Sequence, residues 1–128
     1  MYSKEISLRF SDMDMYGHLN HAKYITLLET ARTELFLDEF FELQEQNILL
    51  LITHVECTYK KPITLKDRVI IDMEFYPISR TRFEGKYVMH NGSGLIYAEA
   101  KTVLACFDAN KKKSTDIPDC LIKKFKEK

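Results

Sequence analysis

The spacing of apolar residues changes near residue 48, which divides the chain into two patterns. At the start, Ile6, Leu8 and Phe10 alternate with polar residues and predict a half-buried strand. From about residue 21 the spacing becomes helical and covers about four turns. The residues that carry this spacing are Tyr24, Leu28, Ala31 and Leu35. A stripe of this width predicts a helix buried against a sheet.

After residue 48, alternating and continuous apolar runs predict strands. The predicted strands cover residues 48–59, 67–76, 83–90 and 95–107. Asn91 to Gly94 predict a hairpin turn, because Asn and Gly accept the positive φ that tight turns require. Small residues in the last strand, Ala98, Ala100 and Ala105, are expected to let the helix approach closely.

Three further segments connect or follow these elements. Residues 38–47 predict a short helical turn or loop, residues 111–113 a solvated lysine turn, and the segment from Asp119 a terminal helix. The order of one strand, one long helix and four more strands predicts an α+β protein with an antiparallel sheet wrapped around one long central helix. We expect a single domain over residues 1–128.

Composition narrows the possible partners and the compartment. The equal counts of acidic and basic residues, 19 each, argue against nucleic acid or an anionic membrane as the partner. No apolar run approaches the roughly 20 residues that span a bilayer, and the first ten residues lack the core of a signal peptide, so we predict a cytoplasmic protein without a membrane partner. The three cysteines have no C-x-x-C spacing and predict neither disulfides nor zinc.

The turn between the first strand and the helix concentrates the chemistry of the chain. It carries Asp12, Asp14, His18, Asn20 and His21. The free backbone N–H groups at the start of a helix can orient polar side chains and bind anionic groups. This turn is therefore the predicted functional site.

The motif R-F-S-D-x-D-x-x-G-H-L-N-H-x-x-Y after a strand, followed by E-x-A-R on the helix, covers residues 9–32. It resembles the acyl-CoA thioesterases of the 4-hydroxybenzoyl-CoA thioesterase class. The resemblance implies a hotdog fold and hydrolysis of an acyl-CoA to a free acid and CoA, without a cofactor. It also implies a homodimer or homotetramer with active sites at the subunit interface.

Thioester hydrolysis requires a carboxylate to attack the carbonyl or to activate water, and a donor for the oxyanion. The resemblance assigns the role of nucleophile or general base to Asp14. The first N–H groups of the helix, around His21 and Ala22, are the predicted oxyanion donors. In the alternative interpretation, Asp14 only caps a turn.

Other residues of the turn have supporting roles in this hypothesis. Asp12 is expected to hold the turn in shape, and Gly17 to supply a backbone angle beside the substrate. His18 and Asn20 flank the helix start and can orient water or the carbonyl, although Asn20 can equally be a simple N-cap and His18 a general base. His21 stands where the family commonly has a second Asn, which leaves its catalytic contribution open.

On the predicted helix, Glu29 and Arg32 are three residues apart and are expected to pair with each other. Because some other hotdog enzymes use a helix carboxylate as catalyst, Glu29 is a reserve candidate. Tyr24 lies on the apolar stripe and is expected to be a core residue at the substrate site.

The phosphates of CoA require cationic contacts. Arg80 and Arg82, at the junction of two predicted strands, are the first candidates. Lys60 and Lys61 are second candidates, and a solvated surface is the alternative for each of these side chains.

The turn also matches part of a calcium-binding loop. Asp12, Asp14 and Gly17 match positions one, three and six of an EF-hand loop, but Tyr16 and Lys23 occupy positions five and twelve, where oxygen ligands are needed. A transition-metal site from His18, His21 and an aspartate has no established spacing. We therefore predict no metal.

Three alternative functions stay open from the sequence. The chain could hydrolyse thioesters of acyl carrier protein, or act as a hotdog dehydratase in which His18 pairs with Glu29. It could also bind CoA esters without turnover.

Overall fold

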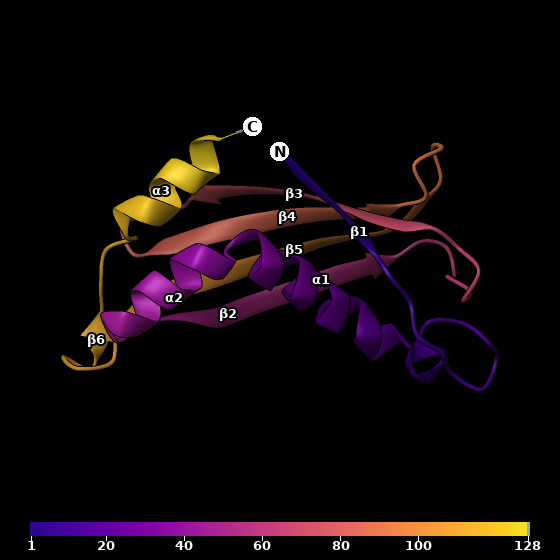
Figure 1. Ribbon diagram of the computed structural model, residues 1–128, viewed down its shortest axis with the longest axis horizontal. Helices are drawn as coiled ribbons and strands as arrows, with labels where there is room; N and C mark the ends of the chain where they lie inside the picture. The colour runs from indigo at the N-terminus through magenta and orange to yellow at the C-terminus, as the bar shows by residue number, and fades with distance from the viewer. Residues whose placement is uncertain (128) are drawn as a thin grey trace.

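The computed structural model describes residues 1–127. One antiparallel sheet has the strand order β1-β3-β4-β5-β2, with β6 paired to β5. Its strands are β1 (Tyr2–Ile6), β2 (Ile48–Tyr59), β3 (Val69–Pro77), β4 (Arg82–His90), β5 (Ile96–Asp108) and β6 (Lys113–Ser114). The helices are the 3₁₀ turn η1 (Phe10–Asp12), α1 (His21–Leu35), α2 (Leu37–Glu45) and α3 (Asp119–Lys126). Figure 1 shows α1 and α2 lying across one face of the sheet, with α3 over its far corner.

The predicted long helix is confirmed as α1. Asn20 is its N-cap, because its side chain accepts a hydrogen bond from the backbone N–H of Ala22 at 3.0 Å. The residues of α1 that turn toward the sheet are buried; they are Tyr24, Leu27, Leu28, Ala31 and Arg32. This face therefore combines the expected apolar stripe with one charged residue.

The face of the sheet toward α1 forms the main core. The alternating residues of β3 on this face are buried as predicted, namely Val69, Ile71, Met73 and Phe75. Phe83, Tyr87 and Met89 of β4 continue the same layer. Alternation places the polar residues of these strands on the opposite face of the sheet.

Two predicted elements differ from the structure by more than a shift of one or two residues at their ends. The first strand ends at Ile6, and Phe10 is 84% exposed, because the chain turns into η1 where the backbone N–H of Asp12 bonds to the carbonyl of Arg9. The segment after α1 is a nine-residue helix, α2, rather than a short turn or loop. Leu43 is buried on this helix, which gives α2 an anchor in the core.

One of the three small residues of β5 that were predicted to face α1 lies on the opposite face of the sheet. Ala98 and Ala100 lie on the α1 side of β5, but Ala105 pairs with Leu51 and Arg82 on the opposite side. An odd difference in position reverses the face of a strand residue, so Ala105 does not make room for α1.

The two edge strands differ in length and in exposed side chains. β1 has five residues, whereas β2 has twelve and carries large exposed apolar side chains. These side chains belong to Leu49, Leu51, Ile52, Val55 and Tyr59. Among residues 1–127, no helix has the length and apolar character needed to cross a membrane.

Candidate active site

The turn before α1 is held in shape by Asp12. Its carboxylate is buried and accepts hydrogen bonds from the backbone N–H and the Nη2 of Arg9, both at 3.0 Å. The side-chain hydrogen bonds from Arg9 lower the pKa of Asp12 despite its burial. Asp12 therefore has the structural role that the sequence predicted.

Gly17 allows the chain to fold back on itself. Its φ is +78°, and the backbone N–H of Asp14 reaches the carbonyl of His18 at 2.7 Å. The backbone N–H of Leu19 then bonds to the carbonyl of Ile63 at 2.7 Å. The turn is consequently fixed to the connection between β2 and β3.

Only one of the two carboxylate oxygens of Asp14 accepts hydrogen bonds within the described residues. Its Oδ1 accepts hydrogen bonds from the backbone N–H groups of Tyr16, at 2.9 Å, and His18, at 3.1 Å. Within residues 1–127, the other oxygen, Oδ2, has no hydrogen-bond partner. Asp14 thus caps its turn, as the alternative interpretation held, and also keeps one oxygen available for a ligand.

The start of α1 lies beside Asp14 and provides an N–H donor. The backbone N–H of Ala22 donates to the side-chain oxygen of Asn20. The backbone N–H of Lys23 donates to the backbone carbonyl of Asn20 at 2.8 Å. In the described part of the chain, the N–H of His21 has no acceptor. Of the two predicted oxyanion donors, only His21 therefore keeps its N–H free.

A pocket of about 340 Å³ brings these groups together. Its lining residues are Asp14, His18, Leu19, His21, Tyr24, Tyr59, Lys60, Lys61 and Pro62. They include Asp14, His18, His21 and Tyr24 of the predicted site and the second cationic candidates Lys60 and Lys61, whereas Gly17 and Asn20 do not line the pocket. Tyr24 is only 4% exposed, and burial raises the pKa of its hydroxyl.

The predicted CoA-binding cations lie in different places. Arg80 and Arg82 belong to the β3–β4 hairpin, at the opposite end of β3 from the turn, and Arg80 pairs with Asp116. Lys60 and Lys61 line the pocket, and Lys60 also pairs with Glu99 at 3.6 Å. Within one chain, the cations beside Asp14 are therefore Lys60 and Lys61, the second candidates from the sequence, and not Arg80 and Arg82.

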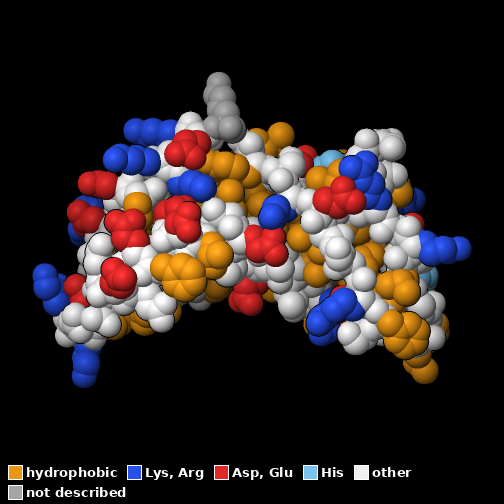
Figure 2. Space-filling model, in the orientation of Figure 1, with side chains coloured by type: hydrophobic (Ala, Val, Ile, Leu, Met, Phe, Trp, Pro, Cys, Tyr) orange, Lys and Arg blue, Asp and Glu red, His pale blue; other side chains and the backbone are white. Residues whose placement is uncertain are grey.

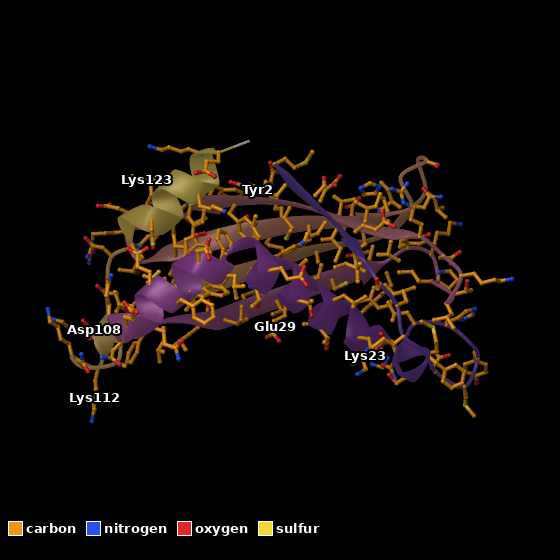
Figure 3. All side chains as sticks on the ribbon, in the orientation of Figure 1. Tyr2, Lys23, Glu29, Asp108, Lys112 and Lys123 are labelled. Carbon is orange, nitrogen blue, oxygen red and sulfur yellow. The ribbon has the colours of Figure 1, made fainter. Side chains whose placement is uncertain are left out.

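The expected pair of Glu29 and Arg32 does not form. Arg32 is 6% exposed and its Nη1 donates to the hydroxyl of Tyr87 at 3.2 Å. That hydroxyl shares a further hydrogen bond with Thr102 at 2.7 Å. Glu29 projects outward from the middle of α1 and does not line the pocket (Figure 3). The pairing prediction is wrong because Arg32 turns inward to Tyr87, whereas Glu29 stays exposed at the surface of α1.

Tyr59 is a pocket residue that sequence reasoning missed, as are Leu19 and Pro62. Its hydroxyl donates to the carbonyl of His21 at 2.9 Å, across 38 positions of sequence. Its ring packs edge-to-face on Tyr24 with centroids 4.7 Å apart. No local signal marked it, because it reads as the last apolar position of a strand.

The turn also exposes three large apolar side chains. Phe10, Met15 and Tyr16 are 84%, 89% and 79% exposed. Figure 2 shows hydrophobic atoms gathered at this end of the molecule, over the turn before α1. Among the residues that the structure describes, no cluster of three or more His, Cys, Asp or Glu could hold a metal ion.

Comparison with known families decides what this arrangement belongs to. The profile of the Thioesterase-like superfamily matches residues 8–125, nearly the whole chain and all of the turn. The chain belongs to the Thioesterase-like superfamily. The predicted family and the predicted class of enzyme, a thioester hydrolase, are confirmed.

Curated members of this superfamily are similar along their full length. The acyl-CoA thioester hydrolase YbgC of Escherichia coli O157:H7 is 24% identical over 125 residues, which cover 95% of this chain and 93% of YbgC. The long-chain acyl-CoA thioesterase FadM of Escherichia coli K12 is 23% identical over 126 residues, covering 96% of each protein. A 1,4-dihydroxy-2-naphthoyl-CoA hydrolase of Synechococcus elongatus is 25% identical over 127 residues, covering 94% of this chain and 91% of that protein.

Solved structures confirm the fold. A 1,4-dihydroxy-2-naphthoyl-CoA thioesterase from Synechocystis superimposes with a TM-score of 0.88 at 16% identity, over 97% of this chain and 94% of that one. A protein from Aquifex aeolicus gives the same TM-score at 20% identity, over 98% of this chain and 100% of the other. The predicted α+β hotdog arrangement is therefore correct.

Proposed function

We propose that the protein hydrolyses an acyl-CoA to a free acid and CoA in the pocket beside Asp14, within one domain formed by residues 1–128. The observation that supports this most directly is the state of Asp14. Two backbone N–H groups orient one of its oxygens, the other oxygen has no partner in residues 1–127, and Asp14 lines the pocket. A carboxylate fixed in this way is suited to act on a bound carbonyl carbon or water.

Two alternative mechanisms are compatible with this geometry. In one, Asp14 attacks the thioester carbon, the C–S bond breaks with release of CoA thiolate, and water then hydrolyses the acyl-aspartate anhydride. In the other, Asp14 takes a proton from water while that water attacks the same carbon and displaces the thiolate. In both, the free N–H of His21 donates to the oxyanion, and His18 and the His21 side chain lie close enough to orient water.

The pocket cations support CoA as the carrier. Lys60 and Lys61 lie on the pocket wall next to the catalytic turn, where the phosphates of CoA need positive charge. Arg80 and Arg82 stay a prediction, because they lie at the other end of β3. Thioesters of acyl carrier protein are the alternative substrate. A cytoplasmic location also stays a prediction.

We further propose that a second copy of the chain pairs along β2. Long apolar edge strands are usually protected by charge, proline or a partner strand, and β2 has twelve residues without Pro, Lys or Arg and with one carboxylate, Glu56. Leu51→Lys is expected to dissociate the oligomer in sedimentation velocity experiments. Leu65→Lys, which alters an equally exposed apolar residue outside β2, is the control. A monomeric wild type would overturn this proposal.

Thiol release tests the proposed activity. Wild type and Asp14→Asn are compared on short, long and aromatic acyl-CoAs, with the matching acyl-carrier-protein thioesters alongside. We expect the substitution to lower kcat by about 10²- to 10⁴-fold while substrate still binds, because it removes the basic and nucleophilic oxygen. Asp38→Asn, which alters an exposed carboxylate on α2 away from the pocket, is the control and should keep wild-type activity.

Other outcomes contradict the proposal in distinct ways. A wild type that binds acyl-CoA without releasing thiol would identify a binding protein. Equal activity of wild type and Asp14→Asn would move the chemistry to His18, which also lines the pocket. Faster turnover of the carrier-protein thioesters than of the CoA thioesters would replace CoA as the proposed carrier.

A further inference from the structure

Beyond the pocket, the inner face of β2 carries an apolar strip that α1 leaves open. We define this strip as Ile52, Val55 and Cys57, whose side chains lie on the same face as the core. Their cross-strand partners are Leu104, Thr102 and Ala100 of β5. Ile52 is 42% and Val55 38% exposed, whereas Leu104 and Thr102 beside them are buried. The core layer is therefore covered over β5 and left open over Ile52 and Val55 of β2, while Cys57 is partly buried against the core.

Tyr59 stands between this strip and the pocket. It is the next inward-facing residue of β2 after Cys57, and it lines the pocket together with the residues that follow it, Lys60 and Lys61. Side chains two positions apart on one face of a strand are direct neighbours. A chain that extended from the thioester along the inner face of β2 would meet the Tyr59 ring first.

The Tyr59 ring is held in this position by two contacts. Its hydroxyl donates to the carbonyl of His21 at 2.9 Å, and its ring packs against Tyr24 at an interplanar angle of 88°. Tyr24 is itself buried in α1 and cannot move aside without disturbing the core. The two tyrosines thus form a wall that joins α1 to the end of β2.

We infer that Tyr59 limits the length of the acyl group. This inference rests on the proposed thioesterase function. With the wall closed, the space for the acyl group beside Asp14 is the solvent-open pocket of about 340 Å³, near the lower end of the roughly 300–1,000 Å³ typical of small-molecule sites, and Tyr59 blocks its extension along β2. Short aliphatic or single-ring aromatic acyl groups fit such a site and contact the faces of the tyrosines. A long aliphatic chain fits only when the strip can be reached from the pocket past the position of the Tyr59 ring.

The test compares chain-length profiles of three proteins. kcat/KM is measured for butyryl-, benzoyl- and palmitoyl-CoA with wild type, Tyr59→Ala and Tyr59→Phe. We expect Tyr59→Ala to raise the ratio of palmitoyl to butyryl kcat/KM by at least about tenfold, since burial of several methylenes on the strip is worth more than 1.4 kcal/mol. Tyr59→Phe keeps the ring and is expected to keep the wild-type ratio, although it loses the hydrogen bond to His21.

Two results would overturn the inference. One is a wild-type profile for Tyr59→Ala, and the other is a shift in Tyr59→Phe as large as in Tyr59→Ala, which would assign the effect to the hydrogen bond. Thermal unfolding of all three proteins checks that the variants are folded, and a ratio within one protein is insensitive to the amount of active enzyme.

The inference can also be separated from the proposed activity. If wild type releases no thiol from any substrate, the thioesterase proposal fails, and the same three proteins are titrated with non-hydrolysable thioether analogues of butyryl- and palmitoyl-CoA. A relative gain in palmitoyl affinity confined to Tyr59→Ala would still support the role of Tyr59. Equal affinity ratios in the three proteins would overturn it.

Discussion

The two ends of α1 carry polar clusters of opposite character. The start cluster, Asp14, His18 and His21, faces a pocket, and within residues 1–127 it keeps an oxygen of Asp14 and the N–H of His21 unpaired. The end cluster, Arg32, Tyr87 and Thr102, is 1–6% exposed and its members bond to one another. A polar cluster that keeps accessible hydrogen-bonding capacity can act on a ligand, whereas one that uses its capacity internally holds the fold.

The position of each cluster on the helix reinforces this difference. Arg32 lies in the last turn of α1, where the partial negative charge of the helix end favours a cation without a carboxylate partner. The start cluster lies at the opposite end, where free N–H groups favour anions such as a developing oxyanion. The same helix dipole therefore stabilises a buried cation at one end and supports chemistry at the other.

Two glycine substitutions give the largest expected contrast in stability. A Cβ on Gly85 would lie 2.7 Å from both Phe75 Cε1 and the hydroxyl oxygen of Tyr87, beside the end cluster. Gly85→Ala is expected to lower the free energy of unfolding by about 3 kcal/mol through overpacking, measured by urea denaturation. A Cβ on Gly17 would meet nothing within 4 Å, so Gly17→Ala is expected to lower it by only about 1 kcal/mol, from its positive φ.

The two glycine variants are expected to rank in the opposite order for loss of activity. Gly17→Ala strains the turn that orients Asp14 and is expected to reduce kcat, while folded Gly85→Ala keeps wild-type kcat/KM. Assays at a temperature where both variants are folded provide the check. A greater loss of activity in Gly85→Ala would mean that the end cluster also serves the site.

A smaller effect is expected when one hydroxyl is removed from the end cluster. Tyr87→Phe leaves Arg32 Nη1 and Thr102 Oγ1 buried without their shared partner. We expect the free energy of unfolding to fall by about 2 kcal/mol, with kcat/KM unchanged. Tyr16→Phe, which removes an exposed hydroxyl, is the control and should change the stability by less than about 0.5 kcal/mol.

The smallest effect concerns pH and Asp12. Because hydrogen bonds from Arg9 lower the pKa of Asp12 in the folded protein, this carboxylate stabilises the fold above its ordinary pKa of 3.8. The stabilisation is lost as pH falls below 3.8 toward the lowered value. The difference in the free energy of unfolding between wild type and Asp12→Asn should therefore be present at pH 6 and narrow progressively below pH 3.8. A difference that stays constant with pH would contradict this account.

Much of the scaffold could be predicted from local pattern. Helical spacing predicted α1, the period-two spacing predicted the buried face of β3, and Asn91 to Gly94 predicted the β4–β5 turn, where Gly92 and Gly94 have positive φ. These features depend on backbone sterics and on a single buried face, which neighbouring residues determine. The end of the first strand could not be predicted, because the hydrogen bonds of Asp12 override the alternation that continues to Phe10.

The candidate site was predictable only where its residues are contiguous. The sequence by itself determined the turn chemistry: two aspartates with separate roles, a glycine at a positive φ and an N-cap at Asn20. Only the tertiary structure brought Tyr59 to His21, placed Lys60 and Lys61 rather than Arg80 and Arg82 beside Asp14, and turned Arg32 away from Glu29. Local hydrogen bonds and backbone angles decide the features of the turn, and these depend on residues close in sequence. Strand pairing and the direction in which α1 faces the sheet decide the long-range placements, and these do not depend on sequence neighbours alone.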